Sequence, residues 1–134
     1  MEFLQPRAKG RPGQTPGSVD YRLARQRALR GLRKGDADRA DFCDAQAELV
    51  RVAVSCSERA GEPCPVCDGE ELRVVRFVFG PRLPKGGRCV SSELELRRLA
   101  HRAGEHRCYV VEVCPQCRWN HLLSTHLLGA ERSA

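Results

Sequence analysis

The stretches that decide the fold are Cys64-Pro65-Val66-Cys67 and Cys114-Pro115-Gln116-Cys117. Each places two thiols three residues apart in a tight turn, because the proline after the first cysteine fixes a φ angle that suits a turn. Two such turns supply four sulfurs, a tetrahedral ligand set that Zn²⁺ favours. The sequence therefore predicts one Zn²⁺ bound by Cys64, Cys67, Cys114 and Cys117. Four protein sulfurs leave no open position for a reacting water, so we expect a structural site and a protein that is not an enzyme.

Several alternatives to this zinc site stay open. A single iron is held by similar turns, so the sequence leaves zinc and iron both possible. Cys89, Cys108 or His121 could replace one of the four ligands. Two redox dithiols of the thioredoxin type are a further alternative, but such motifs stand singly in a βαβ unit, which is not predicted here. Cys43 and Cys56 are expected to pack as small apolar side chains.

The size and the N-terminal residues indicate the class of protein. A chain of 134 residues forms one small domain, which a structural metal would help to stabilise. Residues 1–6 have neither the basic region nor the apolar run of a secretory signal. No apolar run approaches the roughly 18 residues of a membrane-spanning helix. We therefore expect a soluble cytoplasmic protein with reduced cysteines.

The positive charge is concentrated near the N-terminus. The net charge is +6, but residues 1–34 carry nine Lys and Arg against two acids, whereas residues 35–134 carry 14 against 15. Prolines, glycines and scattered cations predict a flexible basic tail over residues 1–17. A basic region of this kind is typical of proteins that bind nucleic acid or an acidic protein surface.

An N-terminal helical pair is predicted over residues 18–61. Its first helix should begin at Ser18 and end at Gly35, with one apolar face and a cationic face that we expect to bind a partner through Arg22, Arg30, Arg33 and Lys34. The stretch 36–60 follows an apolar helical stripe. It predicts one helix, or a short and a long one broken near Asp44.

Residues 62–129 are predicted to form a zinc-ribbon-like part. Residues 72–79, 106–113 and 119–128 have the composition of strands, and the second cysteine turn joins the last two as a hairpin. Residues 80–90 are expected to be a loop. Ser92 and Glu95 form a capping box that starts a short helix ending at Gly104.

This inserted helix accounts for the 46 residues between Cys67 and Cys114. The predicted fold class is α+β: a zinc-ribbon-like three-stranded antiparallel sheet with two CxxC knuckles, an inserted short helix and an N-terminal helical pair. Residues 130–134 are expected to be a frayed C-terminus.

Residues that follow the second knuckle are expected to support the metal. Trp119 should shield the sulfurs in the core, while Asn120 and His121 hydrogen-bond to thiolates or cap the turn. The less favoured interpretation is a recognition patch in which Trp119 stacks on a base. His121 and His126 are an odd number of positions apart, so strand alternation predicts that they face opposite sides of the sheet.

Six short segments together form a distinctive pattern: Val19-Asp20-Tyr21, Cys43-Asp44-Ala45, Cys64 to Cys67, Phe79-Gly80, Tyr109 to Cys114 and Cys117 to Leu122. On these residues the chain resembles a family of short actinobacterial proteins classed as a domain of unknown function. The resemblance covers about residues 18–129. It implies a zinc ribbon with a helical N-terminal part in a bacterial cytoplasm. It implies no mechanism.

Together these features predict a non-catalytic zinc-binding protein that acts as an interaction module. Its expected partner is a protein, RNA or DNA of the transcription or translation machinery, bound through the basic N-terminal region. The alternative is a cytoplasmic thiol redox or metal sensor that uses the four-cysteine site and releases zinc on oxidation.

Overall fold

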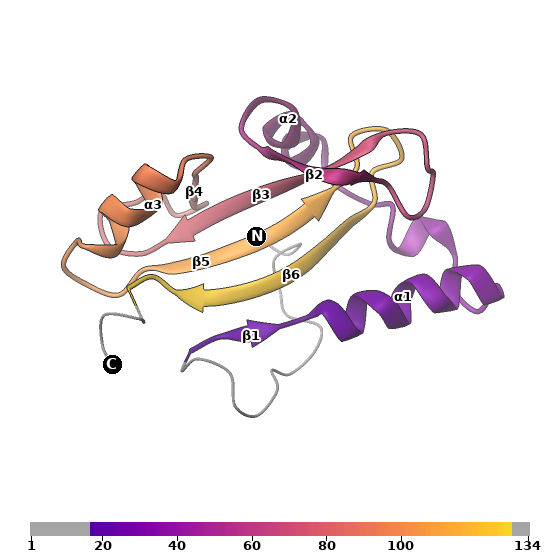
Figure 1. Cartoon of the computed structure of the whole chain (residues 1–134), viewed down its shortest axis with the longest axis horizontal. Coiled ribbons are helices and arrows are strands. Elements are labelled where there is room, and N and C mark those ends of the chain that lie inside the picture. Colours follow the sequence, from indigo (N-terminus) through magenta and orange to yellow (C-terminus); the bar gives the residue numbers. More distant parts are fainter. Residues whose placement is uncertain (1–16, 130–134) are drawn as a thin grey trace.

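A single antiparallel sheet organises the protein. The computed structural model describes residues 17–129, so residues 1–16 of the predicted tail and the predicted frayed end over 130–134 lie outside the described residues. The strands are β1 (Val19–Asp20), β2 (Glu58–Pro63), β3 (Glu71–Phe79), β4 (Arg88–Cys89), β5 (Arg107–Val113) and β6 (Asn120–Leu127). Their order is β1-β6-β5-β3-β2, with β4 also paired to β3 (Figure 1).

The predicted α+β class with an antiparallel sheet is confirmed, but the sheet has six strands instead of three. The three predicted strands correspond to β3, β5 and β6 at its centre. The additional strands lack the signal on which the prediction depended. β1 and β4 have only two residues each, and β2 is exposed along its whole length. None of the three has the run of β-branched and aromatic residues that is typical of a strand.

Helices cover both faces of the sheet. They are α1 (Arg22–Lys34), α2 (Ala47–Ser55) and α3 (Glu93–Ala100). α2 packs through Leu49 and Ala53 on the face that carries Val75 and Val111. On the opposite face, Leu29 of α1 packs on Leu72 and Trp119, and Leu99 of α3 packs on Val78 and Cys108. These two sets of strand residues alternate along β3 and β5, as expected for strands buried on both sides.

The first helix begins later than predicted. Residues 19 and 20 pair with Thr125 and Ser124 of β6 as β1, so Ser18 is not the helix cap. α1 starts at Arg22, whose backbone N–H donates to the Asp20 carboxylate at 2.9 Å. The C-terminal end of α1 lies where it was predicted. Gly35 closes the helix with a φ of 78°, a left-handed conformation that glycine adopts without strain.

The continuous helix over residues 36–60 is wrong, and the alternative of two helices broken near Asp44 is closer. A short 3₁₀ turn spans Arg39–Asp41, and α2 spans only Ala47–Ser55. The chain leaves the helix after Ser55 because residues 58–63 pair with β3 as edge strand β2. β2 crosses the predicted boundary between residues 61 and 62, and the division into two parts stays a prediction.

The inserted helix is confirmed in its position and its cap. The Ser92 hydroxyl accepts a hydrogen bond from the Glu95 backbone N–H at 3.1 Å, as a capping residue does. The helix ends at Ala100 instead of reaching Gly104. The preceding loop includes β4, which pairs with residues 77 and 78 of β3.

A bulge changes the orientation expected for two histidines. Val110 pairs with Ser124 and Val111 with Leu122, so one extra residue lies in β6 between them. His121 pairs with Glu112 and His126 with Cys108, which puts both histidines on the same face of the sheet. The prediction that they face opposite sides is therefore wrong, because alternation holds only along a regular strand. Among residues 17–129, no helix is both long and apolar enough to cross a membrane.

Candidate metal centre

The two cysteine turns meet because of the strand order. Arg73 near the start of β3 pairs with Val113 at the end of β5. The turn before β3 and the turn after β5 therefore lie at the same end of the sheet (Figure 1). α3 lies at the opposite end, where Phe79 pairs with Arg107. Antiparallel pairing thus brings together two segments that are far apart in sequence.

Both turns have the same backbone geometry. The Asp68 N–H donates to the Cys64 carbonyl, and the Arg118 N–H donates to the Cys114 carbonyl, each at 3.0 Å. The residue after each second cysteine is left-handed, with φ of 56° for Asp68 and 72° for Arg118. Backbone N–H groups also point at the sulfurs. Val66 donates to Cys64 Sγ at 3.4 Å, and Cys117 donates to Cys114 Sγ at 3.4 Å.

The four sulfurs form a compact cluster. All of their Sγ atoms lie within 4.8 Å of one another. Cys64 Sγ is 3.7 Å from Cys117 Sγ, and Cys67 Sγ is 3.6 Å from Cys114 Sγ. A tetrahedron with Zn–S bonds of about 2.3 Å has sulfur–sulfur edges of about 3.8 Å. The spacing therefore fits four ligands of one ion, whereas a disulfide would need about 2.05 Å.

The electrostatics of the cluster also favour a cation. Burial raises the pKa of Cys114 and of Cys117 above the ordinary value. Burial acts in the same direction on Cys67, but the Gly69 N–H and the neighbouring thiols outweigh it and hold the pKa of Cys67 below its ordinary range. Four thiolates at this distance repel one another, so a bound divalent cation is what would allow all four to ionise together.

The sulfurs lie in an apolar cluster. Trp119 is fully buried and packs with Cys64 and Cys114, together with Leu29 of α1 and Leu72 of β3. Its position agrees with the favoured interpretation, in which it shields the sulfurs, because a buried ring cannot stack on an outside base. The apolar surrounding covers Cys64 and Cys114 completely, whereas Cys67 and Cys117 are partly buried.

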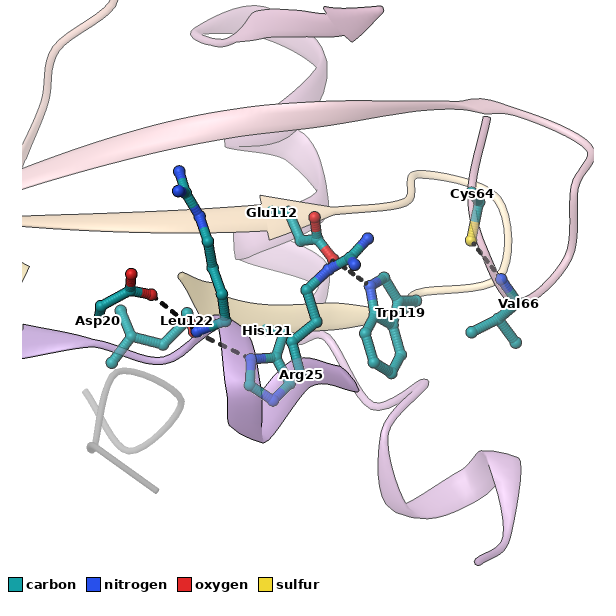
Figure 2. A network of polar contacts seen from close by, with 9 residues as sticks. Asp20, Arg25, Cys64, Val66, Glu112, Trp119, His121 and Leu122 are labelled. Carbon is teal, nitrogen blue, oxygen red and sulfur yellow. Dashed lines mark hydrogen bonds and ion pairs between the residues drawn. The ribbon is translucent and has the colours of Figure 1, made fainter. Parts of the chain in front are cut away.

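The buried carboxylate of Glu112 connects Trp119 to α1. Glu112 Oε2 accepts hydrogen bonds from the Trp119 indole N–H at 2.8 Å and from Arg25 Nε at 2.5 Å (Figure 2). His121 stacks on Trp119 with ring centroids 5.7 Å apart, and its Nδ1 lies 2.9 Å from the Leu122 carbonyl oxygen. His121 therefore supports the tryptophan and is not part of the sulfur cluster. Sequence reasoning missed Arg25 and Glu112.

Asn120 joins the second turn to the segment before α2. Its side-chain Nδ2 donates to the Asp44 carboxylate at 2.8 Å and its backbone N–H donates to the Phe42 carbonyl at 3.3 Å. The Ala45 N–H donates to the Arg118 carbonyl at 3.1 Å. These contacts fix the turn that carries Cys114 and Cys117. The hydrogen bonds of the Asn120 amide go to Phe42, Asp44 and Arg118, so the expected bond to a thiolate is replaced by bonds that hold the turn.

A fifth cysteine lies beside the cluster. Cys43 Sγ is 3.9 Å from Cys117 Sγ. The pKa of the Arg39 guanidinium is raised by these two thiols, with Cys43 as the largest cause. Sequence reasoning assigned Cys43 to packing. The only sequence signal that could have placed it here is the irregular, non-helical stretch around Asp44.

The other predicted site residues lie elsewhere. Cys108 is buried under α3, and Cys89 contacts Cys56, so neither belongs to the four-cysteine cluster. The predicted partner-binding cations all project from α1 and are exposed: Arg22, Arg30, Arg33 and Lys34. Arg27 is exposed on the same helix.

The fold and the site define an α+β protein with a four-cysteine centre that could hold one metal ion. The chain belongs to the family of unknown function DUF5318, whose pattern matches residues 14–134. It is 37% identical over 116 residues to uncharacterised proteins of Mycobacterium tuberculosis and Mycobacterium bovis, with 87% of this chain and 85% of each relative covered. The predicted resemblance to an actinobacterial family is therefore confirmed. No solved structure matches the chain.

Proposed function

We propose that the protein is a zinc-ribbon-like, non-catalytic interaction module in the bacterial cytoplasm. One Zn²⁺ would be bound by Cys64, Cys67, Cys114 and Cys117. The observation that carries this proposal is the sulfur spacing of 3.6 and 3.7 Å between cysteines of different turns, which is close to the edge of a ZnS₄ tetrahedron. With four protein ligands the ion would have a structural role and would fix the end of the sheet next to α1.

Metal analysis of the purified protein tests this proposal. The expected result is one zinc per chain in the wild type and a loss of zinc in Cys117→Ser. The matched control is Cys43→Ser, which removes the neighbouring fifth thiol and should leave zinc at one per chain. A metal-free wild type that is fully folded would contradict the proposal. If the analysis finds one iron per chain, the four-cysteine site is supported and its ion is iron instead of zinc.

The basic face of α1 is the proposed docking surface for a macromolecular partner. This helix carries six cations and no acid over its 13 residues. Arg25 is engaged by Glu112, whereas the remaining cations extend into solvent. The helix also packs on the sulfur cluster through Leu29, so a folded metal site would hold the basic face in one orientation. This arrangement suits contacts with successive phosphates of RNA or DNA.

Paired charge reversals test the docking surface. Arg30→Glu with Arg33→Glu removes two cations from α1, and Lys85→Glu with Arg102→Glu makes the same change in net charge at exposed positions elsewhere. Binding to RNA or DNA oligonucleotides is measured over a range of salt concentrations. The slope of log K against log salt is negative, and the α1 variant should make it less negative by about 1.5, while the slope of the control stays close to that of the wild type. Equal effects of both variants would indicate non-specific attraction. If the wild type binds neither RNA nor DNA, the alternative partner is an acidic protein.

A thiol redox or metal sensor is the second candidate function. The observation that favours it is Cys43, whose thiol is 3.9 Å from Cys117 and beside the Arg39 guanidinium. A nearby thiol could form a disulfide with an oxidised ligand and displace the metal. Peroxide-driven zinc release that slows in Cys43→Ser would support this candidate, and equal release rates would count against it.

A further inference from the structure

A second pair of cysteines lies outside the metal centre. Cys56 immediately follows the last residue of α2 as its C-cap, and Cys89 lies in β4, where it pairs with Phe77 of β3. The two are 33 positions apart in sequence, and the first metal turn lies between them. Both are partly buried. Neither contributes to the metal centre or to the basic face of α1.

The two sulfurs are closer than any other pair of thiols in the protein. All eight cysteines lie within the described residues, and Cys56 Sγ is 2.6 Å from Cys89 Sγ. Unbonded heavy atoms prefer about 3.5 to 4.0 Å, and a disulfide bond is about 2.05 Å long. The sulfur pairs of the metal centre have the wider spacing of ligands around an ion. Only Cys56 and Cys89 are therefore already placed for a direct bond.

An oxidant has a route to this pair. Cys89 borders a groove of about 280 Å³ between α2 and the loop before β4, which is also lined by Glu48, Val52, Phe77 and Gly87. Cys89 donates its S–H to the Cys56 carbonyl oxygen at 3.0 Å. Desolvation by burial, followed by the contact with Cys56, raises the pKa of Cys89. A peroxide in the groove therefore reaches the pair from the side of Cys89, with the Cys56 sulfur directly beside it.

We propose that Cys56 and Cys89 form a reversible dithiol–disulfide pair that hydroperoxides oxidise. One of the two thiols loses its proton and attacks one peroxide oxygen, the O–O bond breaks, and the products are a sulfenic acid and hydroxide, which takes up that proton to give water. The sulfur of the other cysteine then displaces the sulfenic hydroxyl, which leaves with the proton of that second thiol as a second water. Two thiols lose two electrons in total, and one hydrogen peroxide becomes two waters. Low-molecular-weight thiols reverse the reaction by exchange.

The bond would fasten α2 to the sheet. It would join the end of α2 to β4, and it would fix the two walls of the groove relative to each other. Since the bond closes a long loop of chain, it would also stabilise the fold by restricting the unfolded state. The bridge contains no metal ligand, so it can form while the four-cysteine centre keeps its ion.

Peptide mapping tests the proposal directly. Trypsin releases Cys56 in the peptide 52–59 and Cys89 in the peptide 89–97, and each peptide contains a single cysteine. After equimolar hydrogen peroxide and alkylation of the remaining thiols, we expect these peptides to be recovered linked, two hydrogens lighter than their sum. Recovery of both as separate alkylated peptides would overturn the proposal. Linkage of Cys56 to a cysteine other than Cys89 would overturn it as well.

Thermal unfolding provides the second measurement, on the full-length zinc-loaded protein. Oxidation should raise the unfolding midpoint by roughly 5 to 15 °C, and reduction should reverse the shift. Cys56→Ala and Cys89→Ala should each abolish the shift. The matched control Cys108→Ala, which removes a buried thiol outside the pair, should keep it. A linked protein whose midpoint falls would show that the bond distorts the fold, and would overturn the inference that the pair is preformed.

Discussion

Arg25 Nε lies 2.5 Å from the Glu112 carboxylate, although the two residues are 87 positions apart. Glu112 is almost completely buried, and the same carboxylate oxygen also accepts the Trp119 indole N–H. The contact joins α1, β5 and the residue that follows the second cysteine turn (Figure 2). A buried carboxylate is tolerated only where such partners compensate for lost hydration. This network therefore couples the basic helix to the candidate metal centre.

Removing the arginine should destabilise the whole domain. Arg25→Met keeps much of the side-chain volume but leaves the buried Glu112 charge without its cation, so we expect the free energy of unfolding to fall by about 2 to 4 kcal/mol. Urea unfolding followed by far-UV circular dichroism measures the change. The control is Arg27→Met on the exposed side of the same helix, with an expected effect below about 0.5 kcal/mol. Equal effects of the two substitutions would contradict this account.

The centre of the fold could be predicted from the sequence because its signals are local. A run of β-branched and aromatic residues marked β3, alternation marked β5, Ser92 marked the cap of α3, and Gly35 marked the end of α1. The doubled cysteine turn marked the four sulfurs. Each of these signals lies within a few neighbouring residues. A polar edge strand such as β2 has no comparable signal, because it is defined by pairing with Arg73 and Val74 and not by burial.

The residues that sequence reasoning missed depend on long-range contacts. Arg25 is one of six cations on α1, and only its position opposite Glu112 distinguishes it. Cys43 reaches Cys117 because residues 42–45 leave the helical path and hydrogen-bond to residues 118 and 120. The β6 bulge between the partners of Val110 and Val111 likewise reverses the expected sides of the histidines. Periodicity within one segment contains none of this information.

The single tryptophan should report on the metal centre. Trp119 is fully buried and packs with two of the four cysteines. If the sulfurs lose their ion, the two turns should separate and water should reach the indole. We therefore expect chelation to shift the Trp119 emission to longer wavelengths, and added Zn²⁺ to restore it. Emission that is unchanged while zinc is fully removed would show that the turns hold together without metal.

Metal binding should release protons. Burial raises the pKa of Cys114 and Cys117, so without an ion both thiols remain protonated at pH 7, whereas a metal needs their thiolates. We expect at least two protons to be released per Zn²⁺ bound, and the affinity to fall as the pH falls because protons compete with the ion. Calorimetric titration in buffers with different ionisation enthalpies counts the protons. Binding without proton release would contradict the four-thiolate site.

The buried thiol of Cys108 predicts a loss of stability at alkaline pH. Burial raises the pKa of Cys108 from an ordinary value of 9.0 to about 11. Below pH 9 the thiol is protonated in both the folded and the unfolded state and has no effect on the pH dependence. Between pH 9 and 11 the unfolded state loses this proton first, so the free energy of unfolding should fall by about 3 kcal/mol in total. The Cys108→Ala variant lacks this thiol, so its free energy of unfolding should change less over the same pH interval. Urea unfolding of the wild type and of the variant at several pH values measures the difference. If the two free energies of unfolding stay a constant distance apart from pH 8 to 11, Cys108 ionises as freely in the folded state as in the unfolded one, which would contradict the prediction.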